Sequence, residues 1–304
     1  MKPGLCGALL AALWLSASAI AIAAPAKIDL DAFDAAKKRV ALPDGETLAY
    51  VELGNAASPP LVLIHGFTDN ARDWVPLVPF LSTSYRLIIP DLRGHGRSSK
   101  PECCYAPLDF AYDIKLLLDA LGIARADIVG HSLGSIIAQR YAEQWPEHTG
   151  RVVLISSTGG QRPGVKHRPP KIDYAKEIRK LKEPLDPDSP FMVAWWSSPT
   201  PVDEDFLRRQ RGDSAGIPLA VWLAVLDQGI PGYVELQRTL PQLKAPTLLI
   251  WGSADPIMEA EVRQTLREAL PHAKVKIFKG LGHNPFWEDP AAVAASLNSF
   301  FENR

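Results

Sequence analysis

Short apolar runs recur along the chain and alternate with segments of helical periodicity. The runs are wholly or mostly aliphatic and cover residues 61–64, 85–90, 126–130, 151–156, 246–251 and 275–278. Such runs are typical of strands in a parallel sheet that is covered on both faces. We therefore predict a strand at each run, and a further strand at residues 47–53.

Helical stripes separate the predicted strands. One stripe lies on a single helical face and stops before Gly122, a residue type that commonly follows a helix; its members are Phe110, Ile114, Leu117, Leu118 and Leu121. A last helix is expected at about 290–301. The alternation of strand and helix predicts an α/β fold with a doubly wound, mostly parallel sheet and right-handed crossovers.

The alternation is interrupted between residues 159 and 241. Proline is dense there, no buried strand is evident, and aromatic side chains cluster, among them Phe191, Trp195, Trp196 and Trp222. We interpret 159–241 as an inserted, mostly helical lid that divides one core domain into 24–158 and 242–304. A long irregular loop is the alternative, but loops of that length are uncommon inside a compact domain.

The N-terminus has the pattern of a secretory signal peptide. A basic start at Lys2 precedes an uncharged, leucine-rich and alanine-rich stretch that ends in small residues. Cleavage after Ala23 makes 1–23 the signal and predicts export to the periplasm or the medium. The alternative is an uncleaved N-terminal membrane anchor, because about twenty residues can span a bilayer.

Composition narrows the classes of partner. The formal net charge is -1 with dispersed lysine and arginine, which indicates no nucleic-acid partner. A mean hydropathy of -0.03 argues against a multi-span membrane protein. Without the signal, the cysteines that remain are the adjacent pair Cys103 and Cys104, which could form a vicinal disulfide or stay as two free thiols. No metal-ligand cluster flanks them, and we expect no metal or organic cofactor.

The segment Gly130-His131-Ser132-Leu133-Gly134 is a G-x-S-x-G motif between a predicted buried strand and a predicted helix. A strand–turn–helix elbow holds its serine in a strained turn at the carboxyl edge of the sheet. There the N–H groups of the helix N-terminus favour developing negative charge. Ser132 is therefore the candidate nucleophile; the alternative is a serine that merely caps the helix.

A serine nucleophile needs a base, and the base needs an acid that orients it. Asp255 follows the predicted strand at 246–251, and His283 follows the one at 275–278. Residue type, chain order and position after a strand end all fit a triad of Ser132, Asp255 and His283. The alternatives are an aspartate that caps a helix and a histidine in solvent. His65, His95 and His131 are expected to be structural hydrogen-bonding groups.

An acyl-transfer site also needs donors for the oxyanion. The backbone N–H of Leu133, directly after the nucleophile, is the first candidate. The second is expected in the loop that follows His65-Gly66, most simply the N–H of Phe67.

Together these motifs resemble the α/β-hydrolase superfamily, in particular its lidded, esterase-like members. The resemblance rests on 65–67, on Asp91-Leu92-Arg93-Gly94-His95-Gly96-Arg97-Ser98, and on the three triad candidates. It implies an eight-stranded type of sheet, with Ser132 attacking, His283 moving the proton and Asp255 orienting His283. A serine rather than an aspartate nucleophile argues against the epoxide-hydrolase and haloalkane-dehalogenase branches.

The expected function is an exported serine hydrolase that cleaves small, apolar carboxylic esters through an acyl-enzyme. Carbon–carbon hydrolysis of a dienoic diketone, or cofactor-free perhydrolase activity, would use the same triad. A non-catalytic binding protein on this fold is a further alternative, which the complete triad disfavours. The fold supports many chemistries, so the resemblance does not select a substrate.

Overall fold

The computed structural model describes residues 27–158, 173–229 and 239–302. The predicted signal peptide, 1–23, lies outside the described residues, as do parts of the predicted lid. Among the described helices, none has the length and apolarity needed to cross a membrane.

The core is one eight-stranded sheet, with the order β1-β2-β4-β3-β5-β6-β7-β8. β2 runs antiparallel to both of its neighbours, and the pairs from β4 through β8 are parallel. The strands are β1 (Lys38–Ala41), β2 (Thr47–Leu53), β3 (Pro60–Ile64), β4 (Arg86–Pro90), β5 (Ala126–His131), β6 (Thr149–Ile155), β7 (Thr247–Gly252) and β8 (Lys274–Phe278). The predicted mostly parallel α/β sheet is confirmed, and β1 is a strand that the apolar pattern missed.

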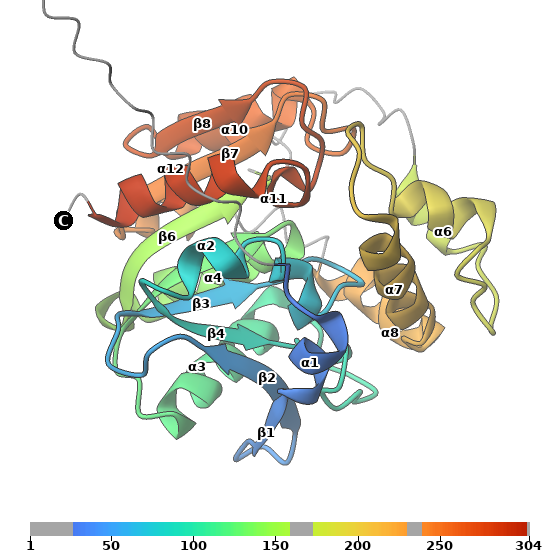
Figure 1. The fold of residues 1–304 in the computed structure, drawn as a ribbon, viewed down its shortest axis with the longest axis horizontal. Helices are drawn as coiled ribbons and strands as arrows, with labels where there is room; N and C mark the ends of the chain where they lie inside the picture. Colours follow the sequence, from blue (N-terminus) through green and yellow to red (C-terminus); the bar gives the residue numbers. More distant parts are fainter. Residues whose placement is uncertain (1–26, 159–172, 230–238, 303–304) are drawn as a thin grey trace, which may run out of the picture.

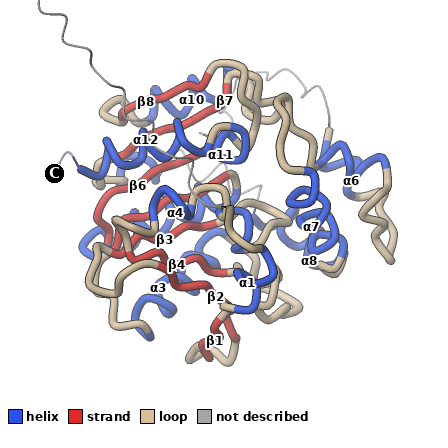
Figure 2. The backbone as a smooth tube through the Cα atoms, in the orientation of Figure 1, coloured by secondary structure: helices blue, strands red, loops and turns tan. Residues whose placement is uncertain are grey.

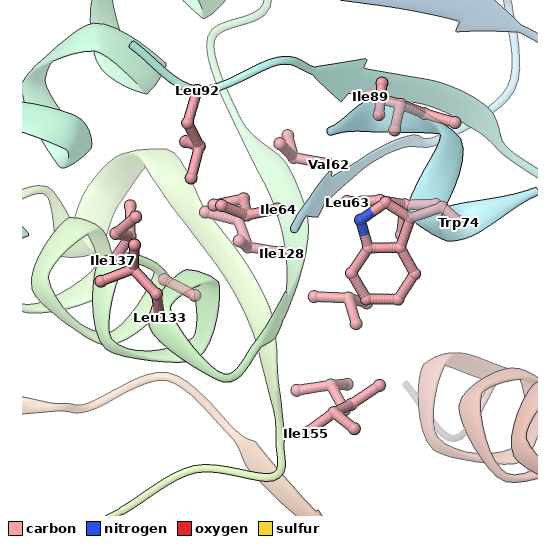
Figure 3. Packing of buried hydrophobic residues seen from close by; sticks show 14 of the residues in the cluster. Val62, Leu63, Ile64, Trp74, Ile89, Leu92, Ile128, Leu133, Ile137 and Ile155 are labelled. Carbon is pink, nitrogen blue, oxygen red and sulfur yellow. The ribbon is translucent and has the colours of Figure 1, made fainter. Parts of the chain in front are cut away.

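The middle strands are apolar because helices cover both of their faces. Leu61, Val62, Leu63 and Ile64 of β3 are fully buried. Successive side chains of a strand point to opposite faces. Ile64 lies beside Leu133 and Ile137 of one helix, and Leu63 lies beside Trp74 on the other side (Figure 3).

Most of the core helices lie in the connections between strands. The core helices are α1 (Leu30–Ala35), η1 (Ala71–Trp74), α2 (Val78–Leu81), α3 (Pro107–Ala120), α4 (Leu133–Gln144), η2 (Pro146–His148), η4 (Leu240–Gln242), α10 (Ala260–Ala269), α11 (Pro285–Glu288) and α12 (Pro290–Glu302). Of these, α1 precedes β1, and α11 and α12 follow β8. α3 packs on α4, which lies on β5 and β6, whereas α12 packs on α2 and α11. The predicted stop of α3 is observed, with Gly122 at a φ of 67°.

The segment between β6 and η4 is helical over most of its described part. It contains α5 (Tyr174–Ile178), α6 (Pro190–Trp195), α7 (Glu204–Ala215), α8 (Leu219–Ala224) and η3 (Val225–Gly229). In Figure 1, α6, α7 and α8 lie together beyond the end of the sheet toward which β3 and β6 point. Figure 2 shows the same separation between the layer of strands and this helical group, which we call the lid.

The two adjacent cysteines are paired. Cys103 and Cys104 form a vicinal disulfide in the exposed stretch before α3. Of the two states that the sequence left open, the structure contains the oxidised one.

Candidate functional site

The nucleophile candidate lies in a sharp turn between a strand and a helix. β5 ends at His131, α4 begins at Leu133, and Ser132 between them has φ 50° and ψ -117°. A residue with a side chain rarely adopts a positive φ, so this turn is strained. The predicted strand–turn–helix arrangement around Ser132 is therefore present.

Two glycines make the turn possible because other backbone lies against them. A methyl group on Gly130 would lie 2.1 Å from the carbonyl oxygen of Gly134. A methyl group on Gly134 would lie 2.2 Å from the carbonyl oxygen of Ile64. Gly130 thus lets β5 end close against α4, and Gly134 lets α4 start close against β3. This packing fixes the position of Ser132 between β5 and α4.

His283 and Asp255 meet although 28 residues separate them. Each lies in a loop after a parallel strand, β8 and β7 respectively, and these strands are neighbours in the sheet. Nδ1 of His283 lies 2.8 Å from Oδ2 of Asp255. The N–H at Nδ1 donates to the carboxylate, which leaves Nε2 with its lone pair, as a general base requires.

Asp255 is held as an ionised acceptor. Its Oδ1 accepts the backbone N–H groups of Ile257 and Met258 at 2.8 and 3.0 Å. Burial alone would raise the pKa of Asp255, but the charge and hydrogen bond of His283 and the two N–H groups outweigh it, so the pKa is lower than usual. The carboxylate can therefore orient His283 at neutral pH.

A cavity of about 630 Å³ brings the candidate residues together. Ser132 and His283 both line it, and so do Phe67 and Leu133, the candidates for the oxyanion donors. Asp255 is buried and is not among the lining residues. The sequence-predicted site is thus brought to one place, with the acid on the far side of the histidine from the cavity.

Both the core and the lid form the cavity wall. Aromatic and aliphatic side chains dominate it; they include Tyr174, Ile178, Trp195, Trp196 and Leu226 from the lid, and Ile257, Met258 and Trp287 from the core. Trp222 is fully buried and packs behind the wall against Phe67. Of the lid tryptophans, two therefore line the cavity and one packs inside the lid.

The other motif histidines are structural, as predicted. His65 donates to the carbonyl oxygen of Gly66 and accepts the N–H of Leu92. His95 donates to the carbonyl oxygen of Arg93. Burial lowers the pKa of His65 well below its usual value and that of His95 to about 4, so both are neutral supports of the loops around the site.

His131 also supports the site. Its ring N–H at Nε2 donates to the backbone carbonyl oxygen of His283 at 3.0 Å. The hydroxyl of Ser156, at the end of β6, donates to the same oxygen at 2.6 Å. Two strand ends thus hold the main chain of the candidate base.

One group of side chains near the site has the residue types of a metal site. Asp69, Asp73 and His131 are buried, and one ligand-type atom from each lies within 4.8 Å of the others. Burial, and for Asp69 also the neighbouring Asp73, raises the pKa of both carboxyl groups well above the usual value. Asp69 Oδ1, Asp73 Oδ2 and His131 Nδ1 have no hydrogen-bond partner among the described residues. The three residues therefore form a buried polar cluster beside the candidate site.

Sequence reasoning missed Thr68 and Asp69, which lie in the loop after β3. Thr68 is buried with a φ of 68°, and its hydroxyl accepts the indole N–H of Trp195 from the lid at 2.9 Å. Asp69 lines the cavity. Nothing in the local pattern signals either role, because a β-branched residue normally argues against a positive φ.

Comparison with known proteins agrees with this geometry. The sequence profile of the alpha/beta hydrolase family matches residues 61–296. The chain belongs to the alpha/beta hydrolase family. The predicted superfamily is thereby confirmed, and with it membership in a family of hydrolases.

The proteins that this chain resembles are named for different reactions. Lipase 1 of Psychrobacter immobilis is 28% identical over 275 residues, covering 86% of this chain and 83% of the lipase. A 2-hydroxy-6-oxononadienedioate/2-hydroxy-6-oxononatrienedioate hydrolase of Paraburkholderia phymatum is 29% identical over 251 residues, covering 77% and 83%. The solved structure of a membrane phospholipase A has a TM-score of 0.74 and 27% identity, covering 88% of this chain and 85% of its own.

Proposed function

We propose that this family member is a serine hydrolase that cleaves carboxylic esters through an acyl-enzyme. The observation that carries the proposal is that Ser132, at the elbow, and His283, oriented by Asp255, line the same cavity. The complete set of nucleophile, base and orienting acid disfavours a purely binding role.

The proposed reaction starts at Ser132. Nε2 of His283 takes the hydroxyl proton while Oγ attacks the ester carbonyl carbon. The resulting oxyanion accepts the N–H groups of Leu133, at the N-terminus of α4, and of Phe67. His283 then gives its proton to the departing alcohol, and water activated by the same imidazole releases the acid. No step needs a metal or an organic cofactor.

The cavity supports an uncharged, apolar substrate. The described lining residues include no lysine or arginine, and Asp173, Glu259 and Glu261 contribute carboxylates. A substrate with its own carboxylate groups would meet like charge there, which disfavours a dienedioate of the kind named for the Paraburkholderia relative. Perhydrolase activity would use the same triad.

We also propose that the protein is exported by the signal pattern at 1–23. The support is the sequence pattern: a basic start at Lys2, an uncharged apolar run, and small residues up to the proposed cut after Ala23. Fractionation of cells that produce the full chain tests this, with mature protein beginning near Ala24 in the periplasm or medium. Retention of the full-length chain in the membrane would favour the anchor.

The decisive experiment is a panel of p-nitrophenyl esters of increasing chain length, with a thioester, an amide and a dienoic diketone beside them. Ser132→Ala should lower ester turnover about 10⁴-fold or more. A fluorophosphonate probe should label wild type and the control Ser296→Ala, whose hydroxyl bonds within α12, but not Ser132→Ala. Equal labelling of all three proteins would rule out Ser132 as the nucleophile. Cleavage of the diketone alone would replace the ester proposal.

A further inference from the structure

The lid touches the loop that carries one of the proposed oxyanion donors. The indole N–H of Trp195, the last residue of α6, donates to Oγ1 of Thr68 at 2.9 Å. Thr68 directly follows Phe67, whose backbone N–H is the proposed second donor. One hydrogen bond between residues 127 positions apart therefore joins the lid to the oxyanion loop, which we define as residues 66–70.

The oxyanion loop does not hold its shape by local preference. Thr68 has a φ of 68° and a branched Cβ, a combination that is unfavourable in the left-handed region. Such conformations persist only where the surroundings enforce them. Because Thr68 is 1% exposed, its hydroxyl cannot exchange the indole for bulk water without movement of the loop.

Trp195 is held firmly enough to act as that support. Its ring stacks on Phe191 at 5.9 Å and meets Tyr174 edge-on at 5.1 Å between centroids. It also packs against Phe67 at 6.1 Å and Trp222 at 6.2 Å. The indole is thus fixed by lid residues on one side and by the oxyanion loop on the other.

A second connection shows that the loop is docked on the lid as a unit. Asn70 Nδ2 donates to Oδ2 of Asp213 in α7 at 3.0 Å, and Arg72 forms an ion pair with the same carboxylate at 2.8 Å. Arg72 also donates to Gln210 at 3.2 Å. Both sides of Asp69 therefore contact the lid. Thr68, before it, bonds to α6, and Asn70 and Arg72, after it, bond to α7.

We propose that Trp195 and Thr68 are positioning residues, and that their hydrogen bond makes the lid set the direction of the Phe67 N–H toward the oxyanion. The inference rests on the proposed ester hydrolysis. It predicts that breaking the bond lowers kcat, because the donor matters most when negative charge develops. Loss of an oxyanion donor costs about 10²–10³-fold in kcat, so a misdirected donor should cost about 10-fold.

The test is a double-mutant cycle on kcat for a p-nitrophenyl ester. Trp195→Phe removes the N–H and keeps an aromatic ring, and Thr68→Val removes the acceptor and keeps the branch. Each should lower kcat about 10-fold, and the double variant should also lose about 10-fold rather than about 100-fold, because both changes break the same bond. Thr68→Ser keeps the acceptor and should restore kcat to within about 3-fold of wild type.

The matched control is Trp145→Phe, the same exchange away from the site. Trp145 follows the last turn of α4, packs against Tyr112 and Tyr141, and does not line the cavity. It should keep kcat within about 3-fold of wild type. The rate of fluorophosphonate labelling should fall in parallel with kcat in Trp195→Phe and Thr68→Val, with melting temperatures near wild type.

The outcomes separate the two proposals. If Ser132→Ala keeps its activity, the proposed function fails whatever the cycle gives. If Ser132→Ala is inactive but the Trp195 and Thr68 effects multiply, or Trp145→Phe loses as much kcat as Trp195→Phe, the positioning inference alone is overturned. An effect confined to KM would also overturn it, because it would place both residues in substrate binding only.

Discussion

Replacing Asp255 by asparagine should disable the base without disturbing the fold. Oδ1 of Asp255 accepts two backbone N–H groups, and Oδ2 accepts the N–H at Nδ1 of His283. In the variant, the amide oxygen keeps the two backbone donors and the NH2 group turns toward Nδ1. His283 must then accept at Nδ1 and carry its proton on Nε2, where it cannot take the proton of Ser132.

The size of the effect follows from the alternative orientation of the amide. To present its oxygen to His283, the asparagine must leave the N–H groups of Ile257 and Met258 without an acceptor in a buried site. Each unsatisfied donor costs about 1–3 kcal/mol, so the productive orientation is disfavoured by about 2–6 kcal/mol. At about 1.4 kcal/mol per factor of ten, that is a loss of about 30-fold to 10⁴-fold in kcat.

The assay is kcat for a p-nitrophenyl ester at pH 7–8, with melting temperature recorded in parallel. Asp289→Asn is the control: its Oδ1 also accepts a backbone N–H, that of Ala292, and it is an exposed residue at the start of α12. The control should stay within about 3-fold of wild type. If Asp255→Asn keeps more than a tenth of the wild-type kcat, the tautomer argument is wrong.

Three further variants test the surroundings of the site. In the folded state the pKa of His95 is about 4, so wild type should lose about 3 kcal/mol as pH falls from about 6.5 to 4. Urea unfolding of His95→Asn should lack that loss, and equal pH slopes for both proteins would contradict it. Asp73→Asn should raise the melting temperature at pH 8 and not near pH 4, because a raised folded-state pKa means that stability is lost as pH rises. A lower melting temperature at pH 8 would refute this. Gly134→Ala should cost about 3 kcal/mol or more, whereas Gly212→Ala, with nothing within 4 Å, should be neutral or stabilising; similar melting temperatures would contradict the clash.

The strands that could be predicted are those whose burial on both faces requires a run of apolar residues. Strand segments that are covered on both faces are apolar, as in β3, residues 128–130 of β5 and residues 152–155 of β6. β1 has no such apolar run, because Lys38, Arg39 and Ala41 are exposed and Val40 is only partly buried. Its place at the edge comes from pairing with β2, which no local pattern reports.

The triad candidates were predictable for a topological reason. Parallel strands bring their carboxyl ends to one edge, so residues that follow β5, β7 and β8 meet whatever their separation in the chain. The bond between Trp195 and Thr68 has no such rule behind it. It depends on how α6 of the insertion packs against the core. Proline density and aromatic content predict that the insertion exists, but they do not predict how it packs.

The same insertion therefore has two consequences for catalysis. Its side chains line the cavity, where in the proposed reaction they would contact the acyl or alcohol group, and Trp195 also donates a hydrogen bond to the loop that carries Phe67. Substrate preference and oxyanion stabilisation then share a residue, and changes to the lid near Trp195 cannot alter one alone. The elbow at Ser132 is different, because it is set by Gly130 and Gly134 against β3 and does not depend on the lid. In the proposed enzyme, the elbow of the core thus sets the position of the nucleophile, and the lid sets the choice of substrate. The oxyanion loop contacts both parts.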